Sequence, residues 1–236
     1  MSGWPRTAHG HIGLADVIAK IEATILIGLS TVGGAFTEAI VGEMARKVQR
    51  PIIFPLSNPT TKSEAKAVDL IRWTDGRALV ATGSPFAPVS YGGKKIPIAQ
   101  CNNVFIFPAM GLAVAAAGAS RVTDMMFLAA ARALAGDSPA LKDSSAALLP
   151  ALTDIRRVAA EIAVAVGLAA QKDGVAPNLK EDELRQRVMR RSGLRLTKAM
   201  SRSIGTQKFT NVGAWRSSQL KNLSLTDLLS RMRGIV

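Results

Sequence analysis

Small polar residues and amides lie where two apolar segments of this chain end. The first segment, Pro51–Leu56, stops at Ser57-Asn58-Pro59, and the second, Thr24–Ile27, runs into Gly28-Leu29-Ser30. In open α/β sheets, ligands bind outside the carboxyl ends of the strands, so polar residues at such ends mark a candidate site. The pattern predicts part of a nucleotide-binding domain.

Two adjacent amides, Asn102 and Asn103, precede a third apolar segment, Val104–Phe107, which we expect to form another strand. An amide both donates and accepts hydrogen bonds, which suits a substrate hydroxyl, a carboxylate or a nicotinamide amide. For Asn58 the alternative is an ordinary turn before proline, and for Asn102 and Asn103 it is backbone capping in a loop. The residue types alone leave these alternatives open.

The glycines between Gly28 and Gly34 precede a predicted helix, whose free backbone N–H groups could receive a phosphate. A plain tight turn explains them equally well. The segment is not a P-loop, because Gly34 stands where that motif needs lysine, and the G-x-G-x-x-G pattern is absent from the chain.

Strand-like and helix-like segments alternate through the first part of the chain, which predicts a mostly parallel sheet covered by helices. We expect strands at 25–29, from Pro51 onward and at 78–82, and a long loop around Gly92-Gly93. Expected helices begin after Thr37, at Ser63, after Thr123 and at Asp154. The helix after Thr123 should bury Phe127, Ala130, Ala131 and Leu134. The one at Asp154 should bury Ile155, Val158, Ala159, Ile162, Ala163 and Val166.

Composition limits the class of protein. The chain has 236 residues, of which 48% are hydrophobic, and one cysteine, Cys101, so no internal disulfide can form. The low-charge stretch 104–120 is shorter than the roughly 20 apolar residues that a membrane span needs, and the N-terminus lacks the apolar core of a signal peptide. We expect a cytoplasmic protein without a membrane partner.

The net charge of +13 is concentrated near the C-terminus. Residues 1–186 hold 19 Lys and Arg against 16 Asp and Glu, whereas residues 187–236 hold 11 against one. A basic arm of this kind could bind nucleic acid through phosphate contacts. Its aromatics, Phe209 and Trp215, are too few for a stacking platform, and charged segments are often merely solvated, so nucleic-acid binding is only the alternative hypothesis.

Five motifs in order resemble the carboxyl-terminal NAD-binding domain of malic enzymes. They are Gly33–Thr37, Arg50–Thr60, Trp73–Ala78, Gly83–Phe86 and Asn102–Pro108. The resemblance continues through Arg121–Asp124, Leu149–Leu152 and Ile155-Arg156. It departs from the family pattern at Cys101 and Ala109, where glycine is usual.

The resemblance implies an α/β fold: a partial Rossmann-like, doubly wound parallel sheet with a helical C-terminal part and a divergent basic tail. It implies NAD or NADP as cofactor, Mg²⁺ or Mn²⁺ in the full-length family, and oxidative decarboxylation of malate to pyruvate and CO₂. A homo-oligomer is compatible with it. The implied cofactor residues are Gly28, Leu29, Ser30, Ser57 and Asn58, and the implied substrate residues are Asn58, Asn102 and Asn103.

In the family, the catalytic Tyr and Lys and the metal-binding carboxylates lie upstream of the matched segment. We therefore expect no catalytic residue and no metal site in this chain, and no detectable turnover by the chain alone. Half of a doubly wound sheet should also leave a strand edge and an apolar face exposed. The expected organisation is an unmatched segment 1–13, a partial NAD-binding domain 14–188 and a basic tail 189–236.

Overall fold

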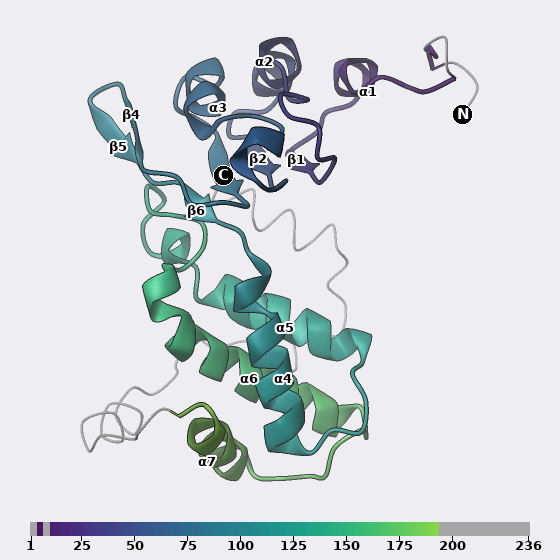
Figure 1. The fold of residues 1–236 in the computed structure, drawn as a ribbon, viewed down its shortest axis with the longest axis vertical. Coiled ribbons are helices and arrows are strands. Elements are labelled where there is room, and N and C mark those ends of the chain that lie inside the picture. The colour runs from purple at the N-terminus through teal and green to yellow at the C-terminus, as the bar shows by residue number, and fades with distance from the viewer. Residues whose placement is uncertain (1–3, 7–9, 194–236) are drawn as a thin grey trace. The chain divides into compact units, whose positions relative to one another are not determined.

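The computed structural model describes residues 4–6 and 10–193, which fall into two compact units (Figure 1). The first unit is formed by the chain up to Asn102 together with Lys142–Leu149. The second begins at Asn103 and resumes at Pro150.

A four-stranded parallel sheet forms the centre of the first unit, in the order β1-β2-β3-β6. Its strands are β1 (Ile25–Gly28), β2 (Ile52–Pro55), β3 (Leu79–Thr82) and β6 (Ala99–Gln100). The register pairs Gly28 with Pro55 and Thr82 with Gln100, so these strands end at one edge of the sheet. The predicted parallel α/β fold, Rossmann-like in its arrangement, is confirmed.

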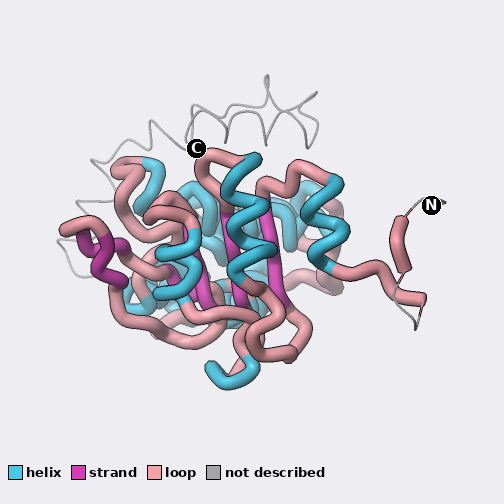
Figure 2. Tube along the Cα trace, turned by 90° about the horizontal axis from the view of Figure 1, so that it is seen from above, coloured by secondary structure: helices cyan, strands magenta, loops and turns pink. Residues whose placement is uncertain are grey.

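Helices α1 (Leu14–Lys20), α2 (Glu38–Lys47) and α3 (Ala67–Trp73) cover one face of this sheet (Figure 2). The predicted cap at Thr37 is confirmed, because its hydroxyl accepts from the Ile40 N–H at the start of α2. Burial of the inward faces of the helices against the strands provides the apolar stabilisation of the unit. The core of this unit includes Ile18, Leu26, Val41, Met44, Ile53, Leu70, Ile71 and Val80.

Strand β1 lies at one edge of the sheet as far as the described residues show. Its residues alternate, with Leu26 and Gly28 buried and Ile25 and Ile27 exposed by 38% and 54%. One side of the strand therefore packs beneath the helices, whereas the other presents apolar side chains to the surface, as expected for a partial sheet.

Two sequence predictions in this unit were wrong in detail. The long loop around Gly92-Gly93 is a hairpin of β4 (Val89–Tyr91) and β5 (Lys94–Ile96), whose tight turn uses the positive φ of both glycines. The helix expected from Ser63 begins at Ala67, after the 3-10 turn η1 (Thr60–Lys62).

The strand expected at Val104–Phe107 is also absent. Instead, β6 precedes the asparagines, and the segment after them forms the 3-10 turn η2 (Asn103–Phe105) and the start of a helix. The apolar run was misassigned because a short buried run has the same composition in a helix and in a strand.

Four helices form the second unit: α4 (Phe107–Ala117), α5 (Asp124–Gly136), α6 (Ile155–Lys172) and α7 (Glu181–Arg191). Helix α6 packs against the other three. Short 3-10 turns lie at η3 (Pro139–Leu141) and η4 (Leu152–Asp154). The unit shares one apolar core, which includes Phe105, Ala113, Met126, Val158, Ile162, Val166 and Leu184.

The start of α5 was predicted correctly, since the Thr123 hydroxyl accepts from the Met126 N–H. Its buried face was predicted only in part: Ala130 is buried as expected, but Met126, which was not predicted, is also buried, and Phe127 is 46% exposed. Helix α5 is apolar on nearly all sides, so periodicity did not select a face. In α6 the predicted Val158, Ile162, Ala163 and Val166 are buried, whereas the predicted Ile155 and Ala159 are only partly buried.

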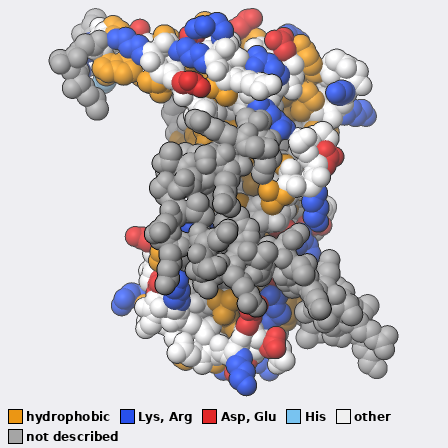
Figure 3. All heavy atoms as spheres, turned by 180° about the vertical axis from the view of Figure 1, so that it is seen from behind, with side chains coloured by type: hydrophobic (Ala, Val, Ile, Leu, Met, Phe, Trp, Pro, Cys, Tyr) orange, Lys and Arg blue, Asp and Glu red, His pale blue; other side chains and the backbone are white. Residues whose placement is uncertain are grey.

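No helix among the described residues is long and apolar enough to span a membrane. Most of the basic tail, 194–236, lies outside the described residues. Over the described residues in Figure 3, Lys and Arg side chains are interspersed with Asp and Glu. The side chains of one sign therefore do not gather into a single patch on that face.

Candidate functional site

The predicted cofactor residues meet at the carboxyl ends of β1 and β2. Gly28 is the last residue of β1, and its carbonyl accepts from the Leu56 N–H at 3.0 Å. Ser57 follows, and its hydroxyl accepts from the Thr31 N–H at 2.9 Å. Parallel pairing therefore places the turn after β1 directly against the turn after β2, at the edge where ligands bind in such sheets.

Asn58 connects this edge to β3. The hydroxyl of Ser84, two residues after β3, donates to Asn58 Oδ1 at 2.5 Å, and Asn58 Nδ2 donates to the Leu56 carbonyl at 3.5 Å. A Cβ on Gly83 would lie 2.2 Å from the Leu56 carbonyl oxygen, so this close approach requires glycine. Asn58 itself is exposed, and its side chain is oriented from two sides.

Asn102 follows β6 at the same edge. The Cys101 N–H donates to the Thr82 carbonyl at 2.9 Å, which extends the strand pairing to the residue before Asn102. Asn102 is exposed. Asn103, also exposed, is the first residue of the second unit, so the first unit contains only one of the two predicted amides.

A buried carboxylate, Glu64, joins these turns and was not identified from the sequence. Its Oε1 accepts from the Ser30 N–H at 2.8 Å, from the Ser30 hydroxyl at 2.8 Å and from the Ser57 hydroxyl at 2.5 Å. Its Oε2 accepts from the Ser57 N–H at 3.3 Å. Two of the predicted residues, Ser30 and Ser57, are thereby bound to one side chain.

The same carboxylate explains Gly28. A Cβ at this position would lie 2.5 Å from Glu64 Cδ, a distance that real Cβ contacts do not reach. Burial raises the pKa of the Glu64 carboxyl, but the hydrogen bonds from Ser57 and Ser30 outweigh it and hold the pKa below its ordinary value. Glu64 is therefore an anion at neutral pH, although its side chain is fully buried.

Glu64 is visible in the sequence, but its assignment to a predicted helix left its role unrecognised. A glutamate after Ser63 reads as a first-turn residue of a helix, where carboxylates are common. In the structure, residues 63–66 precede the helix and are not part of it. The only indication of a special role was the glutamate itself, and it was counted as part of the helix expected from Ser63.

An open depression of about 500 Å³ lies on the first unit. It lies between the loop before α2 and the segment leading into α3. None of the predicted cofactor residues lines it. Its polar lining residues include Thr37, Thr60, Thr61, Ser63, Lys66 and Asp69.

The chemistry of the edge fits a dinucleotide and not a metal. Hydroxyl, amide and backbone N–H groups gather there beside exposed apolar residues such as Leu29, which is 75% exposed. Within the described ranges, no group of three or more His, Cys, Asp and Glu could hold a metal ion. Burial raises the pKa of the Cys101 thiol, which makes it a poor nucleophile at neutral pH.

Known proteins similar to this chain are malic enzymes. The family model described as malic enzyme, NAD binding domain, matches residues 3–171. The NAD-dependent malic enzyme of Edwardsiella ictaluri is 52% identical over 188 residues, which are 80% of this chain and 33% of that protein. The NAD-dependent malic enzyme of Sodalis glossinidius is 54% identical over 173 residues, 73% of this chain and 31% of that protein.

Solved structures agree on the fold. The malic enzyme of Entamoeba histolytica superimposes with a TM-score of 0.62 at 20% identity, over 97% of this chain and 41% of that one. The malic enzyme of Pyrococcus horikoshii superimposes with a TM-score of 0.58 at 24% identity, over 75% of this chain and 36% of that one. The chain spans about a third of the length of the curated relatives it matches. Because the family model matches most of the chain, the chain belongs to the malic enzyme family, and the region it represents is the NAD-binding domain of that family.

Proposed function

We propose that this chain binds NAD at the carboxyl edge of its parallel sheet, as the dinucleotide-binding portion of a malic enzyme. One observation carries the proposal: hydrogen bonds among Thr31, Ser57 and Glu64 join the turns after β1 and β2. They do so in a chain that belongs to this family. The relatives named above are NAD-dependent, which favours NAD over NADP.

The proposed roles follow from residue chemistry. The exposed Asn58 amide, oriented by Ser84, can pair with the nicotinamide carboxamide or with a malate or pyruvate oxygen. Gly28, Leu29, Ser30 and Ser57 would form the wall of the cofactor cleft, and Asn102 would contact substrate; the role of Asn103, in the second unit, stays a prediction. Bound NAD would accept hydride in the family reaction, oxidative decarboxylation of malate to pyruvate and CO₂.

None of the exposed residues in this set transfers a proton at neutral pH. Hydroxyls and amides bind and orient, whereas Glu64, which could exchange a proton, is fully buried. The role proposed for this edge is therefore binding and orientation. The Mg²⁺ or Mn²⁺ of the family reaction has no ligand set among the described residues, and we assign it none here.

Calorimetric titration of NAD into the purified chain tests the proposal. Asn58→Asp keeps the acceptor for the Ser84 hydroxyl but removes the amide donor, so we expect NAD affinity to fall about 10-fold, the equivalent of one lost hydrogen bond. Asn178→Ala, at an exposed position of the second unit, is the matched control and should bind like the wild type. Absence of NAD binding by the folded wild-type chain would refute the proposal.

A malate-dependent assay with Mg²⁺ or Mn²⁺ should accompany the titration. It tests separately the prediction that the chain alone gives no turnover. Nucleic-acid binding through the basic tail gains no support from the comparisons, and most of that tail lies outside the described residues. The domain limits, a homo-oligomer and a cytoplasmic setting stay predictions.

A further inference from the structure

The turn after β1 has a backbone that needs support. Thr31 has a φ of 58°, in the left-handed region that a β-branched residue rarely adopts. Such a conformation costs on the order of 1–3 kcal/mol and persists only where the surroundings hold it. Thr31 and its neighbours Leu29 to Gly34 are exposed, so the support does not come from burial of the turn itself.

The contacts that hold this turn come from Glu64 and its neighbours. The Glu64 carboxylate binds Ser30 directly, and it binds Thr31 through Ser57, whose hydroxyl donates to Glu64 and accepts from the Thr31 N–H. The main chain adds two bonds, because the Phe36 N–H donates to the Glu64 carbonyl at 2.9 Å and the Gly34 N–H donates to the Ser63 carbonyl at 3.1 Å. Residues 30–36 are thus fixed at both ends.

The Ser30 and Ser57 donors to the Glu64 carboxylate, together with its own backbone N–H, are all uncharged. No Lys or Arg in the described part of the chain forms an ion pair with it. A buried charge is tolerated only when its hydrogen bonds are made, and an ionised acceptor forms bonds about twice as strong as a neutral one. The arrangement is therefore sensitive to loss of the charge as well as to loss of the side chain.

We propose that Glu64 is a positioning residue of this site: its carboxylate fixes the turn after β1 against the turn after β2 in the conformation that receives the dinucleotide. Glu64 does not touch the ligand, because it is fully buried, and acts through Ser30 and Ser57. This inference rests on the proposed function, since it names the residue that shapes the same site.

The test compares two variants of the first unit. Glu64→Gln keeps the size of the side chain, and its amide oxygen can retain the three bonds of Oε1, but its NH₂ group would face the Ser57 N–H in place of Oε2. Val41→Ala, in the core beneath α2, is the control: it should lower stability without contacting the turn. Circular dichroism and urea denaturation establish that both variants fold.

The expected result is a loss of NAD affinity of about 10-fold or more in Glu64→Gln, and wild-type affinity in Val41→Ala. A merely structural role would lower the unfolding free energy and leave the affinity of the folded protein unchanged. Wild-type NAD affinity in Glu64→Gln would therefore overturn the proposal. If Glu64→Gln does not fold, Glu64→Asp, which keeps the charge but shortens the side chain by one methylene, replaces it, and we again expect NAD affinity to fall.

Amide hydrogen exchange supplies a readout that needs no ligand. Glu64→Gln should exchange the Ser30 and Thr31 amides about 10-fold faster than the wild type. Val41→Ala should leave their exchange rates unchanged relative to those of the β1 amides. If the wild type does not bind NAD, the proposed function fails, and this exchange still decides whether Glu64 fixes the turn. Unchanged exchange in Glu64→Gln would overturn the positioning role as well.

Discussion

Two carboxylates of the first unit are stabilised in opposite ways. Glu64, at the carboxyl edge of the sheet, is fully buried and accepts only from uncharged donors. Glu43, on the outer side of α2, is partly exposed and pairs with Arg46 at 2.8 Å and Lys47 at 3.1 Å. Its pKa is lowered to about 2, first by the hydrogen bond from Arg46 and then by that from Lys47.

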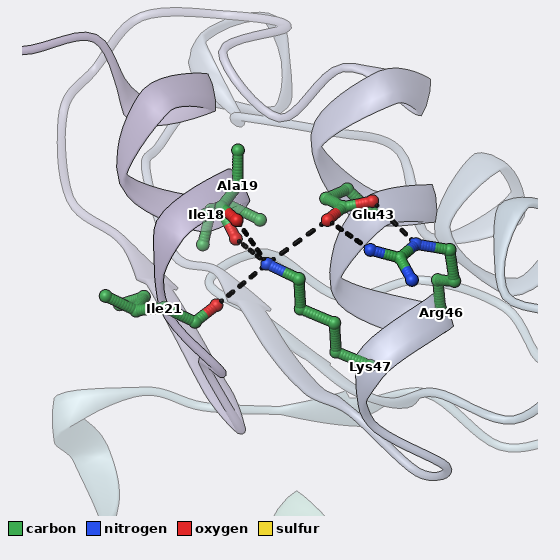
Figure 4. A network of polar contacts seen from close by, with 6 residues as sticks. All are labelled: Ile18, Ala19, Ile21, Glu43, Arg46 and Lys47. Carbon is green, nitrogen blue, oxygen red and sulfur yellow. Dashed lines mark hydrogen bonds and ion pairs between the residues drawn. The ribbon is translucent and has the colours of Figure 1, made fainter. Parts of the chain in front are cut away.

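The region around Glu43 links two helices (Figure 4). The ammonium of Lys47 donates to the carbonyls of Ile18, Ala19 and Ile21, at 2.7, 2.6 and 3.2 Å. These carbonyls lie at the end of α1, where backbone acceptors lack partners in the helix and a cation is favoured. Lys47 therefore fastens α1 to α2, and Glu43 holds Lys47 in place.

The two carboxylates have different roles: one stabilises the packing of regular helices, and the other fixes the conformation of a turn. Around Glu43, charges meet near solvent and join two regular helices whose conformation needs no special residue. Around Glu64, one anion holds an irregular turn that includes a non-glycine residue with positive φ. We infer that changes at the first region alter stability alone, whereas changes at the second also alter what the edge of the sheet can bind.

The largest effect is expected from Gly28→Ala. The added Cβ would lie 2.5 Å from Glu64 Cδ, and the carboxylate cannot move without breaking its bonds, so we expect a loss of about 3 kcal/mol in unfolding free energy. NAD binding should be lost with it. Urea denaturation and calorimetry measure the two effects.

Gly42→Ala is the matched control for that substitution. Gly42 lies within α2, and a Cβ there would meet nothing within 4 Å. Replacing a helical glycine should stabilise the protein by about 0.5–1 kcal/mol. Equal effects of the two substitutions would contradict the close packing of Gly28 on Glu64.

Lys47→Met should have the next largest effect. It removes the donor to three α1 carbonyls, and we expect a loss of about 1–2 kcal/mol in unfolding free energy, with faster hydrogen exchange in α1. NAD affinity should not change. Lys95→Met, at an exposed position of the hairpin, is the control and should leave stability unchanged. A fall in NAD affinity in Lys47→Met would contradict the inference that the region around Glu43 affects stability alone.

Acidification should weaken both regions. Both carboxyls have a folded pKa below the ordinary value of 4.5, so their contributions are complete above that pH and are lost as the pH falls through the folded pKa, about 2 for Glu43. We expect unfolding free energy to fall below pH 4.5. The slope should be shallower in Glu64→Gln and in Glu43→Gln, and an unchanged slope in either would show that the carboxyl is not a stabilising anion.

The smallest effect is expected from Arg46→Ala. The Arg46 side chain is 69% exposed, and solvent-exposed ion pairs contribute little to stability. Urea denaturation should detect little change, and raising the salt concentration to about 1 M should reduce even that difference. The same salt concentration should not change the hydrogen-exchange rates of the Ser30 and Thr31 amides, because the buried contacts of Glu64 are screened far less.

Local patterns predicted the elements of this chain well where a residue's neighbours in sequence decide its conformation. Thr37 and Thr123 cap helices as expected, and β1, β2 and β3 lie within a residue or two of their predicted ranges. The caps are hydrogen bonds between residues three apart, and the strands are visible as short apolar runs in the sequence. The ordered motifs also identified the family, because a series of short segments in sequence carries that information without coordinates.

Sequence alone thus determined the parallel α/β fold, the family and the candidate residues at the strand ends. Only the tertiary structure decided that the strand at the asparagines precedes them, that β4 and β5 pair, and that Glu64 turns inward to meet Ser30. Glu64 and Ser30 are 34 residues apart, and their contact exists only because parallel pairing brings the ends of β1 and β2 together. No local pattern encodes such a contact, because its energy arises from hydrogen bonds that form only after the sheet has assembled.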